Sequence, residues 1–211
     1  MNALPQILES LEKGILESNS EVRIYEKSYT EYKNVKLLMV KTKRKRYILA
    51  TGKGELFNDL QGQLIKDNYK VCPLTHENRL VLNHYFDYTN PKAFGTKGAS
   101  IGLGDRLGLA SPGHIEAIRG YDIKPVLAQQ SIRELTLTNR SMEDLLDAAA
   151  FAVFQEGYKD GYGADGDHIK KESDIEKAIQ LGFSMLTLDC SDYIPKGIAE
   201  KSFSDVSAEY E

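Results

Sequence analysis

From residue 98 onward, short apolar segments alternate with helix-type segments, and this alternation restricts the fold more than any other feature of the sequence. Regular alternation of this kind is typical of βα units on a parallel sheet. We therefore predict a parallel α/β sheet over residues 91–211, arranged either as part of a barrel or as a doubly wound sheet. The predicted strands cover 99–103, 123–129, 161–168 and 183–189, and the predicted helices begin at Ser111 or cover 141–157 and 173–182.

The ends of these predicted helices carry residues that suit those positions. Ser111 is expected to be an N-cap, with Pro112 at the first helical position, where a missing N–H costs nothing. Ser141 and Asp144 have the spacing of a capping box. Gly182 stands where a helix commonly ends in glycine.

Residues 1–90 predict a smaller α+β unit in front of this domain. The basic run at 41–46 lies between two predicted strands, which favours a hairpin tip over a phosphate-binding patch or a nuclear signal. The spacing of apolar residues predicts helices over 4–17 and 54–68 and strands over 35–40, 46–50 and 69–75.

Polar side chains follow each of the four predicted parallel strands. The carboxyl ends of parallel strands meet at one rim, so these residues are expected to share a site. In chain order they are Asp105 and Arg106; Gln129, Gln130, Ser131, Arg133 and Glu134; Asp165, Asp167 and His168; and Asp189, Ser191 and Asp192.

Each of these residues also has a structural interpretation. Asp105 and Arg106 can form an ion pair that holds a glycine-rich turn, and Asp189 can cap a helix. His114 lies in the first turn of a predicted helix, where a surface position is common, and Gln129 and Gln130 can bond neighbouring loops.

The segment "GADGDH" at 163–168 suits a divalent metal, because carboxylate oxygen and imidazole nitrogen are common ligands. Adjacent strand residues point to opposite faces, so Asp167 and His168 need not both bind. The glycines at 98, 102 and 104 do not have the spacing of a dinucleotide-binding loop, which disfavours a bound dinucleotide.

The same residues resemble those of the tagaturonate epimerase family, which interconverts D-tagaturonate and D-fructuronate. The similar stretches are "GLGDRLGLASPGH", "KPVLAQQSIRE", "VFQEGYKDGYGADGDHIK" and "FSMLTLDCSDYI". The resemblance implies that residues 91–211 form the first half of a TIM-barrel-like catalytic domain, which is incomplete because four strands cannot close an eight-stranded barrel. It also implies a divalent metal, such as Mn²⁺, Zn²⁺ or Ni²⁺. Family members are about twice this long and supply further site residues from their second half.

The resemblance and the chemistry of C4 inversion together imply roles for the candidates. Cleavage between C3 and C4 with rejoining, or migration of the carbonyl through an enediol, needs a metal and proton-transfer groups; transient oxidation by a nicotinamide is disfavoured. Asp167 and His168 are expected at the metal or beside it. Asp105, Glu134 and Asp189 are expected to transfer protons, and Arg106, His114, Gln129, Gln130, Ser131 and Arg133 to bind the substrate.

Composition limits the other possibilities. A formal net charge of −4 disfavours nucleic acid as a partner. The amphipathic N-terminus differs from a signal peptide and no long apolar run is present, which predicts a cytoplasmic protein without a membrane partner. The alternatives to the epimerase are a class II type aldolase or sugar isomerase, and a non-catalytic sugar-acid-binding half-barrel. We also expect either a homo-oligomer or a missing C-terminal half.

Overall fold

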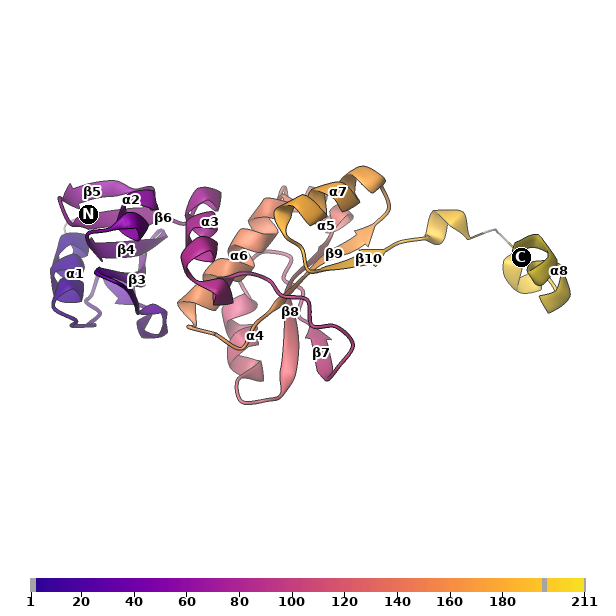
Figure 1. Cartoon of the computed structure of the whole chain (residues 1–211), viewed down its shortest axis with the longest axis horizontal. Helices are drawn as coiled ribbons and strands as arrows, with labels where there is room; N and C mark the ends of the chain where they lie inside the picture. The colour runs from indigo at the N-terminus through magenta and orange to yellow at the C-terminus, as the bar shows by residue number, and fades with distance from the viewer. Residues whose placement is uncertain (1–2, 195–196, 211) are drawn as a thin grey trace.

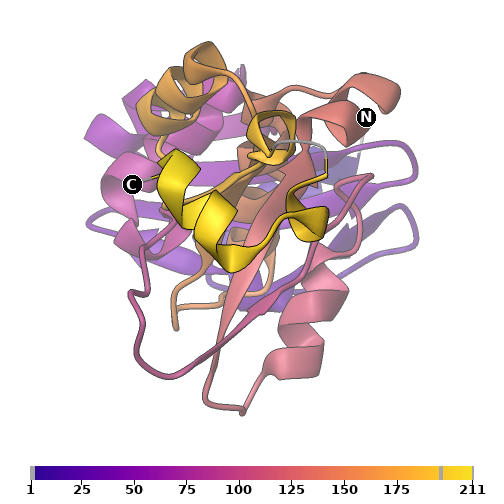
Figure 2. The same cartoon turned by 90° about the vertical axis from the view of Figure 1, so that its right-hand side faces the viewer.

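The computed structural model describes residues 3–194 and 197–210. An antiparallel sheet at the N-terminal end and a parallel sheet after it form the body, and helix α8 (Phe203–Tyr210) lies apart from them (Figure 1). Figure 2 views the molecule from the α8 end, with the antiparallel sheet behind the parallel one. Among the described helices, none combines the length and the apolar composition that crossing a bilayer requires.

The N-terminal sheet has the strand order β1-β3-β4-β6-β5, and β2 pairs with the other part of β3. All of its pairings are antiparallel. The strands are β1 (Val22–Ile24), β2 (Thr30–Tyr32), β3 (Val35–Thr42), β4 (Arg46–Gly52), β5 (Gln63–Lys66) and β6 (Tyr69–Pro73).

Both faces of this sheet are covered, which explains the nearly continuous apolar run of β3. Leu38 and Val40 pack against helix α1 (Ala3–Glu12), whereas Leu37 and Met39 belong to a second cluster on the opposite face. Because successive strand residues point to opposite faces, a strand covered on both sides must be apolar at every position. The basic run between β3 and β4 forms the predicted hairpin tip.

The predicted helix over 54–68 is wrong beyond its first turns. Helix α2 (Glu55–Asp59) ends early, and β5 follows and pairs with β6. A Cβ on Gly62 would lie 2.5 Å from the carbonyl oxygen of Val71, so only glycine permits this close pairing. Sequence analysis also missed helix α3 (His76–Tyr85), and it extended α1 past Gly14, whose φ of +74° is unfavourable for a helix.

The second sheet contains four parallel strands in the order β10-β9-β8-β7. This curled half of a barrel confirms the predicted α/β class. The strands are β7 (Ala99–Gly102), β8 (Ile123–Ser131), β9 (Gly163–Ile169) and β10 (Met185–Leu188), and the connecting helices are α4 (Ser111–Ile118), α5 (Ile132–Leu137), α6 (Met142–Gln155) and α7 (Glu172–Leu181). Short 3₁₀ turns cover Glu26–Ser28, Asp87–Thr89, Ser191–Tyr193 and Ile198–Glu200.

The ends of these helices follow local chemistry, with one correction. Ser141 and Asp144 form the predicted capping box of α6, and Gly182 ends α7 with a φ of +89°. Ser111 is already the first residue of α4, so Ala110 takes the N-cap position that was predicted for Ser111. The α4 start is held instead by a side chain from the preceding loop, described below.

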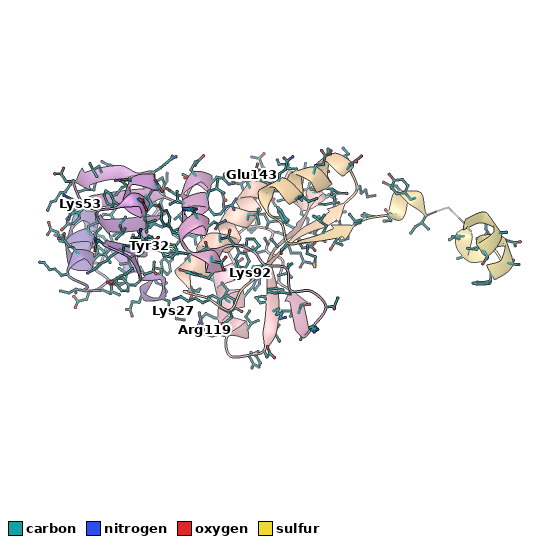
Figure 3. The ribbon with its side chains drawn as sticks, in the orientation of Figure 1. Lys27, Tyr32, Lys53, Lys92, Arg119 and Glu143 are labelled. Atoms are coloured by element: carbon teal, nitrogen blue, oxygen red, sulfur yellow. The ribbon has the colours of Figure 1, made fainter. Side chains whose placement is uncertain are left out.

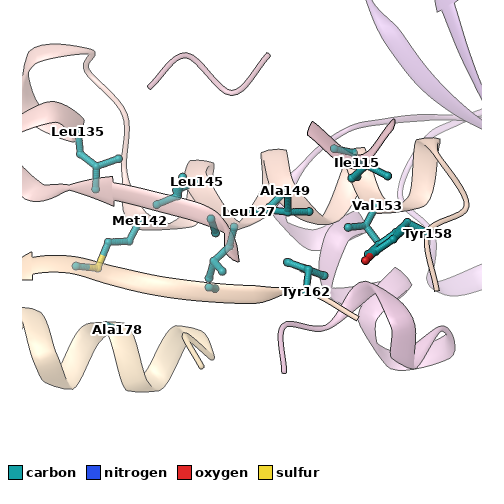
Figure 4. Packing of buried hydrophobic residues seen from close by; sticks show 14 of the residues in the cluster. Ile115, Leu127, Leu135, Met142, Leu145, Ala149, Val153, Tyr158, Tyr162 and Ala178 are labelled. Atoms are coloured by element: carbon teal, nitrogen blue, oxygen red, sulfur yellow. The ribbon is translucent and has the colours of Figure 1, made fainter. Parts of the chain in front are cut away.

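Helix α6 packs against both sheets. Ala149 and Val153 belong to the cluster that covers the parallel sheet (Figure 4), whereas Phe151 and Phe154 belong to the cluster of the antiparallel sheet. A polar contact also joins the two parts: Lys27, near the N-terminal sheet (Figure 3), lies 2.7 Å from the carboxylate of Glu116 on α4. Packing therefore continues across the predicted boundary at residue 90.

Candidate active site

A cleft of about 1280 Å³ lies at the carboxyl ends of the parallel strands. It collects most of the polar residues that sequence analysis assigned to a shared site. Its lining includes Asp105, Arg106, Gln129, Ser131, Arg133, Glu134, Asp167, His168 and Asp189, together with Gly104, Leu107, Ile132, Lys170, Lys171 and Asp174. The structure tests the position of these residues, and their chemical roles stay predictions.

Asp105 organises the loop between β7 and α4. Its carboxylate accepts hydrogen bonds from the backbone N–H groups of Leu107, Ala110 and Ser111, and the residue is only 7% exposed. These N–H groups would otherwise lack partners at a turn and at a helix start. The charged residue in this short connection therefore has a structural function, whether or not it also transfers protons.

Arg106 and Glu134 form an ion pair at the rim, with 2.5 Å between Nε and Oε1. Glu134 also takes part in the capping box of α5 with Ser131, in which each side chain bonds the backbone N–H of the other residue at 3.4 Å. Arg133 forms no ion pair with a described residue and is exposed in the cleft. Of the two arginines predicted to bind a carboxylate, Arg133 is thus the one without an acidic partner.

Gln129 and Asp165 lie on neighbouring strands at the base of the site. Gln129 Nε2 donates to Asp165 Oδ2 at 3.2 Å, and Thr187 Oγ1 donates to the same oxygen at 2.8 Å. Asp165 is fully buried. Strand polarity alone predicts that Asp165 lies near the site. Its contact with Thr187 on β10 is visible only in the structure.

Two predicted substrate-binding residues do not line the cleft. Gln130 is 2% exposed; its Nε2 donates to the Arg106 carbonyl and its Oε1 accepts from Arg140 at 2.8 Å, so it holds the loops together. His114 lies within α4, beyond the loop that forms the rim, and its buried Nδ1 has no hydrogen-bond partner among the described residues. For both residues the predicted position is corrected: strand order brings them near the rim but not to its inner side.

Asp167 and His168 form a close pair at the end of β9, with 2.7 Å between Oδ1 and Nδ1. The backbone at His168 is left-handed, with φ of +55°, which breaks the alternation of side chains and lets both residues line the cleft. The hydrogen bond to Asp167 raises the pKa of the His168 imidazole. With Nδ1 engaged, Nε2 is the nitrogen left for a ligand.

Lys170 is a cleft residue that sequence analysis missed, although it follows β9 directly. Its Nζ lies 3.0 Å from Ser191 Oγ, 3.0 Å from Asp192 Oδ2 and 3.6 Å from Asp189 Oδ2. Hydrogen bonds from Ser191, followed by the charge of Lys170, lower the pKa of Asp189, which is therefore ionised at neutral pH. The position of Lys170 could have been predicted from the sequence, because a lysine that directly follows a parallel strand lies at the same rim.

The donor types at the rim suit a divalent metal only in part. Asp167 and His168 offer carboxylate oxygen and imidazole nitrogen, and Oδ1 of buried Asp165 accepts no hydrogen bond from a described residue. Within residues 3–194 and 197–210, however, no three histidine, cysteine or acidic side chains come close enough together to hold an ion. Any metal would need additional ligands.

Comparisons with known proteins give consistent matches. The family model for tagaturonate epimerase matches residues 25–211. The tagaturonate/fructuronate epimerase of Thermotoga maritima is 37% identical over 176 residues, which are 81% of this chain and 36% of that protein. The native crystal structure of the fructuronate-tagaturonate epimerase of Cohnella laeviribosi has 49% identity and a TM-score of 0.87, and a complex with one glycerol has 50% and 0.86.

Each of these crystal structures covers 100% of this chain, and this chain covers 41% of theirs. The chain thus spans less than half the length of these relatives. The match of the family model extends over most of the sequence and includes every strand of the cleft. The chain belongs to the tagaturonate epimerase family.

Proposed function

We propose that this chain is part of an enzyme that interconverts D-tagaturonate and D-fructuronate by inverting the configuration at C4. One observation carries the proposal: carboxylates, an imidazole and cationic side chains from all four parallel strands or the loops after them line one cleft. In parallel α/β folds, chemistry takes place at this end of the sheet. The names of the relatives supply the substrates.

Arg133 is the residue best suited to bind the carboxylate of the sugar acid. Its guanidinium lines the cleft without an acidic partner, and guanidinium and carboxylate groups match in a bidentate geometry. Arg106 is held by Glu134 and would have to release it first. The substrate would therefore lie with its carboxylate toward α5.

Proton transfer falls to the carboxylates around this position. The C4 hydrogen of these sugar acids is not acidic, because C4 is not adjacent to the ketone at C2. The reaction therefore proceeds either by cleavage and re-formation of the C3–C4 bond or through an enediol that moves the carbonyl to C3. Asp189 is ionised at neutral pH and lines the cleft, so it can accept a proton from a substrate hydroxyl or carbon. Glu134, released from Arg106, and Asp105 are the further candidates.

A divalent metal such as Mn²⁺, Zn²⁺ or Ni²⁺ belongs to this proposal. Such an ion would polarise the ketone in either route. His168 would bind it through Nε2, and Asp167 would orient the imidazole through Nδ1, as carboxylates commonly do for metal-binding histidines. The remaining ligands would come from outside the described residues, since those residues do not complete a site.

Product analysis by NMR tests the proposed function. The enzyme of which this chain is a part, incubated with D-tagaturonate and each metal in turn, should form D-fructuronate with all six carbons retained. Release of two fragments would instead identify an aldolase, and saturable binding without conversion would identify a sugar-acid-binding protein. Arg133→Met should raise KM. Asp122→Ala, at an exposed residue outside the cleft, should change neither kcat nor KM.

A further inference from the structure

The side chain of Gln129 lies in a slot that two glycines keep open. A Cβ on Gly102 of β7 would lie 2.3 Å from Gln129 Oε1, and a Cβ on Gly104 would lie 2.9 Å from the Gln129 carbonyl oxygen. Gly102 does not have a positive φ, so its backbone conformation does not require glycine. Glycine at position 102 therefore provides space for the Gln129 amide.

Asp165 holds one end of this amide. Its Oδ2 accepts from Gln129 Nε2 on one side and from Thr187 Oγ1 on the other, and these bonds link β8, β9 and β10. The NH₂ group of Gln129 therefore faces Asp165, and Oε1 faces away from it. The amide is thus held in one orientation, which Thr187 supports through Asp165.

The exposed end of the amide is a free acceptor at the cleft. Gln129 lines the cleft, and its Oε1 accepts no hydrogen bond from any described residue. A neutral carbonyl oxygen suits the hydroxyl groups of a sugar acid and repels its carboxylate. Asp165, by contrast, is fully buried with Oδ1 unpartnered, a costly arrangement that native proteins retain for a reason.

We propose that Gln129 Oε1 accepts a hydrogen bond from a hydroxyl of the bound sugar acid, and that Gly102, Asp165 and Thr187 are positioning residues for this contact. The inference rests on the proposed function and deepens it: Gln129 recognises the hydroxyl-bearing part of the substrate while Arg133 binds the carboxylate. Residues on β7, β9 and β10 thus position one amide on β8. This gives Gly102, Asp165 and Thr187 a role in binding although none of them contacts the substrate itself.

A double-mutant cycle tests this through the affinity for D-fructuronate, measured by titration calorimetry. Gln129→Ala and Gly102→Ala should each weaken binding about three- to tenfold, the value of one neutral hydrogen bond. If Gly102 acts through Gln129, the double variant should bind no more weakly than Gln129→Ala alone. Ser100→Ala, on the same exposed strand, is the matched control and should bind like the wild type.

Thr187 provides a second, independent comparison. Thr187→Val removes the donor to Asp165 at nearly constant shape and should weaken binding, whereas Thr187→Ser keeps the hydroxyl and should restore it. The side-chain NH₂ resonances of Gln129 should shift in Gly102→Ala and Thr187→Val without any ligand, which a general loss of stability would not produce. Thermal midpoints equal to that of Ser100→Ala would show that the variants are folded.

The outcomes separate the two proposals. Wild-type protein that binds neither sugar acid would refute the proposed function and, with it, the substrate contact. Wild-type binding with an unaffected Gly102→Ala variant, or independent effects that multiply in the double variant, would refute the positioning of Gln129 alone.

Discussion

Asp105→Ala should destabilise the protein by about 2–4 kcal/mol. The variant leaves the N–H groups of Leu107, Ala110 and Ser111 without their common acceptor. Loss of a helix-capping side chain costs about 0.5–2 kcal/mol, and each hydrogen bond to a charged group contributes about 1.5–3 kcal/mol before water replaces part of it. Leu107 is 66% exposed, so water can reach that part of the loop and the full sum is not expected.

Urea unfolding followed by far-ultraviolet circular dichroism measures this change. Asp105→Asn keeps one acceptor oxygen but places an NH₂ group opposite a backbone N–H. Its stability should therefore fall by about half as much as that of Asp105→Ala, or by about 1–2 kcal/mol. Asp122→Ala, at an exposed acid whose side chain forms no hydrogen bond with a described residue, should stay within about 0.5 kcal/mol of the wild type. A loss below about 0.5 kcal/mol for Asp105→Ala would refute the structural function of this carboxylate.

Three further results are expected. Cys190 should react with a thiol reagent in the folded protein and Cys72 only after unfolding, because burial raises the pKa of the Cys72 thiol to about 12; equal rates would contradict this. NMR titration should give His168 a pKa above its ordinary value and Asp167→Asn should lower it, so the stabilising contribution of this pair is present at low pH and is lost as the pH rises through the raised pKa. Phe154→Ala should cost about 3–5 kcal/mol in urea unfolding, because this ring is fully buried between α6 and the antiparallel sheet; a loss near zero would show that the two sheets do not share a core.

The parts of the fold that depend on neighbours along the chain were predictable. Periodic apolar residues predicted the parallel strands and the helices α4, α6 and α7, but not α5. Capping followed from residues three apart, as at Ser141 and Asp144. The rim was predictable for the same reason: in consecutive βα units, strand polarity alone brings the residues after each strand together. Asp105, Gln129, Asp167 and Asp189 all line the cleft as expected.

Contacts between distant segments decided the rest. The apolar positions at 56, 60 and 64 have helical spacing, but pairing of Gln63–Lys66 with Tyr69–Pro73 overrides this preference. Gln130 lies next to Gln129 on β8, yet contacts with Arg140 and the Arg106 carbonyl bury it away from the cleft. Sequence order determines which residues reach the rim.

Which of them face the cleft, and which partners hold them, depends on side-chain packing across strands that are distant in sequence. Gly102 illustrates the limit: from the sequence it is one glycine of a turn, and only the position of the Gln129 amide shows what its missing side chain makes room for. Because such contacts join residues on three different strands, no local pattern in the sequence carries them.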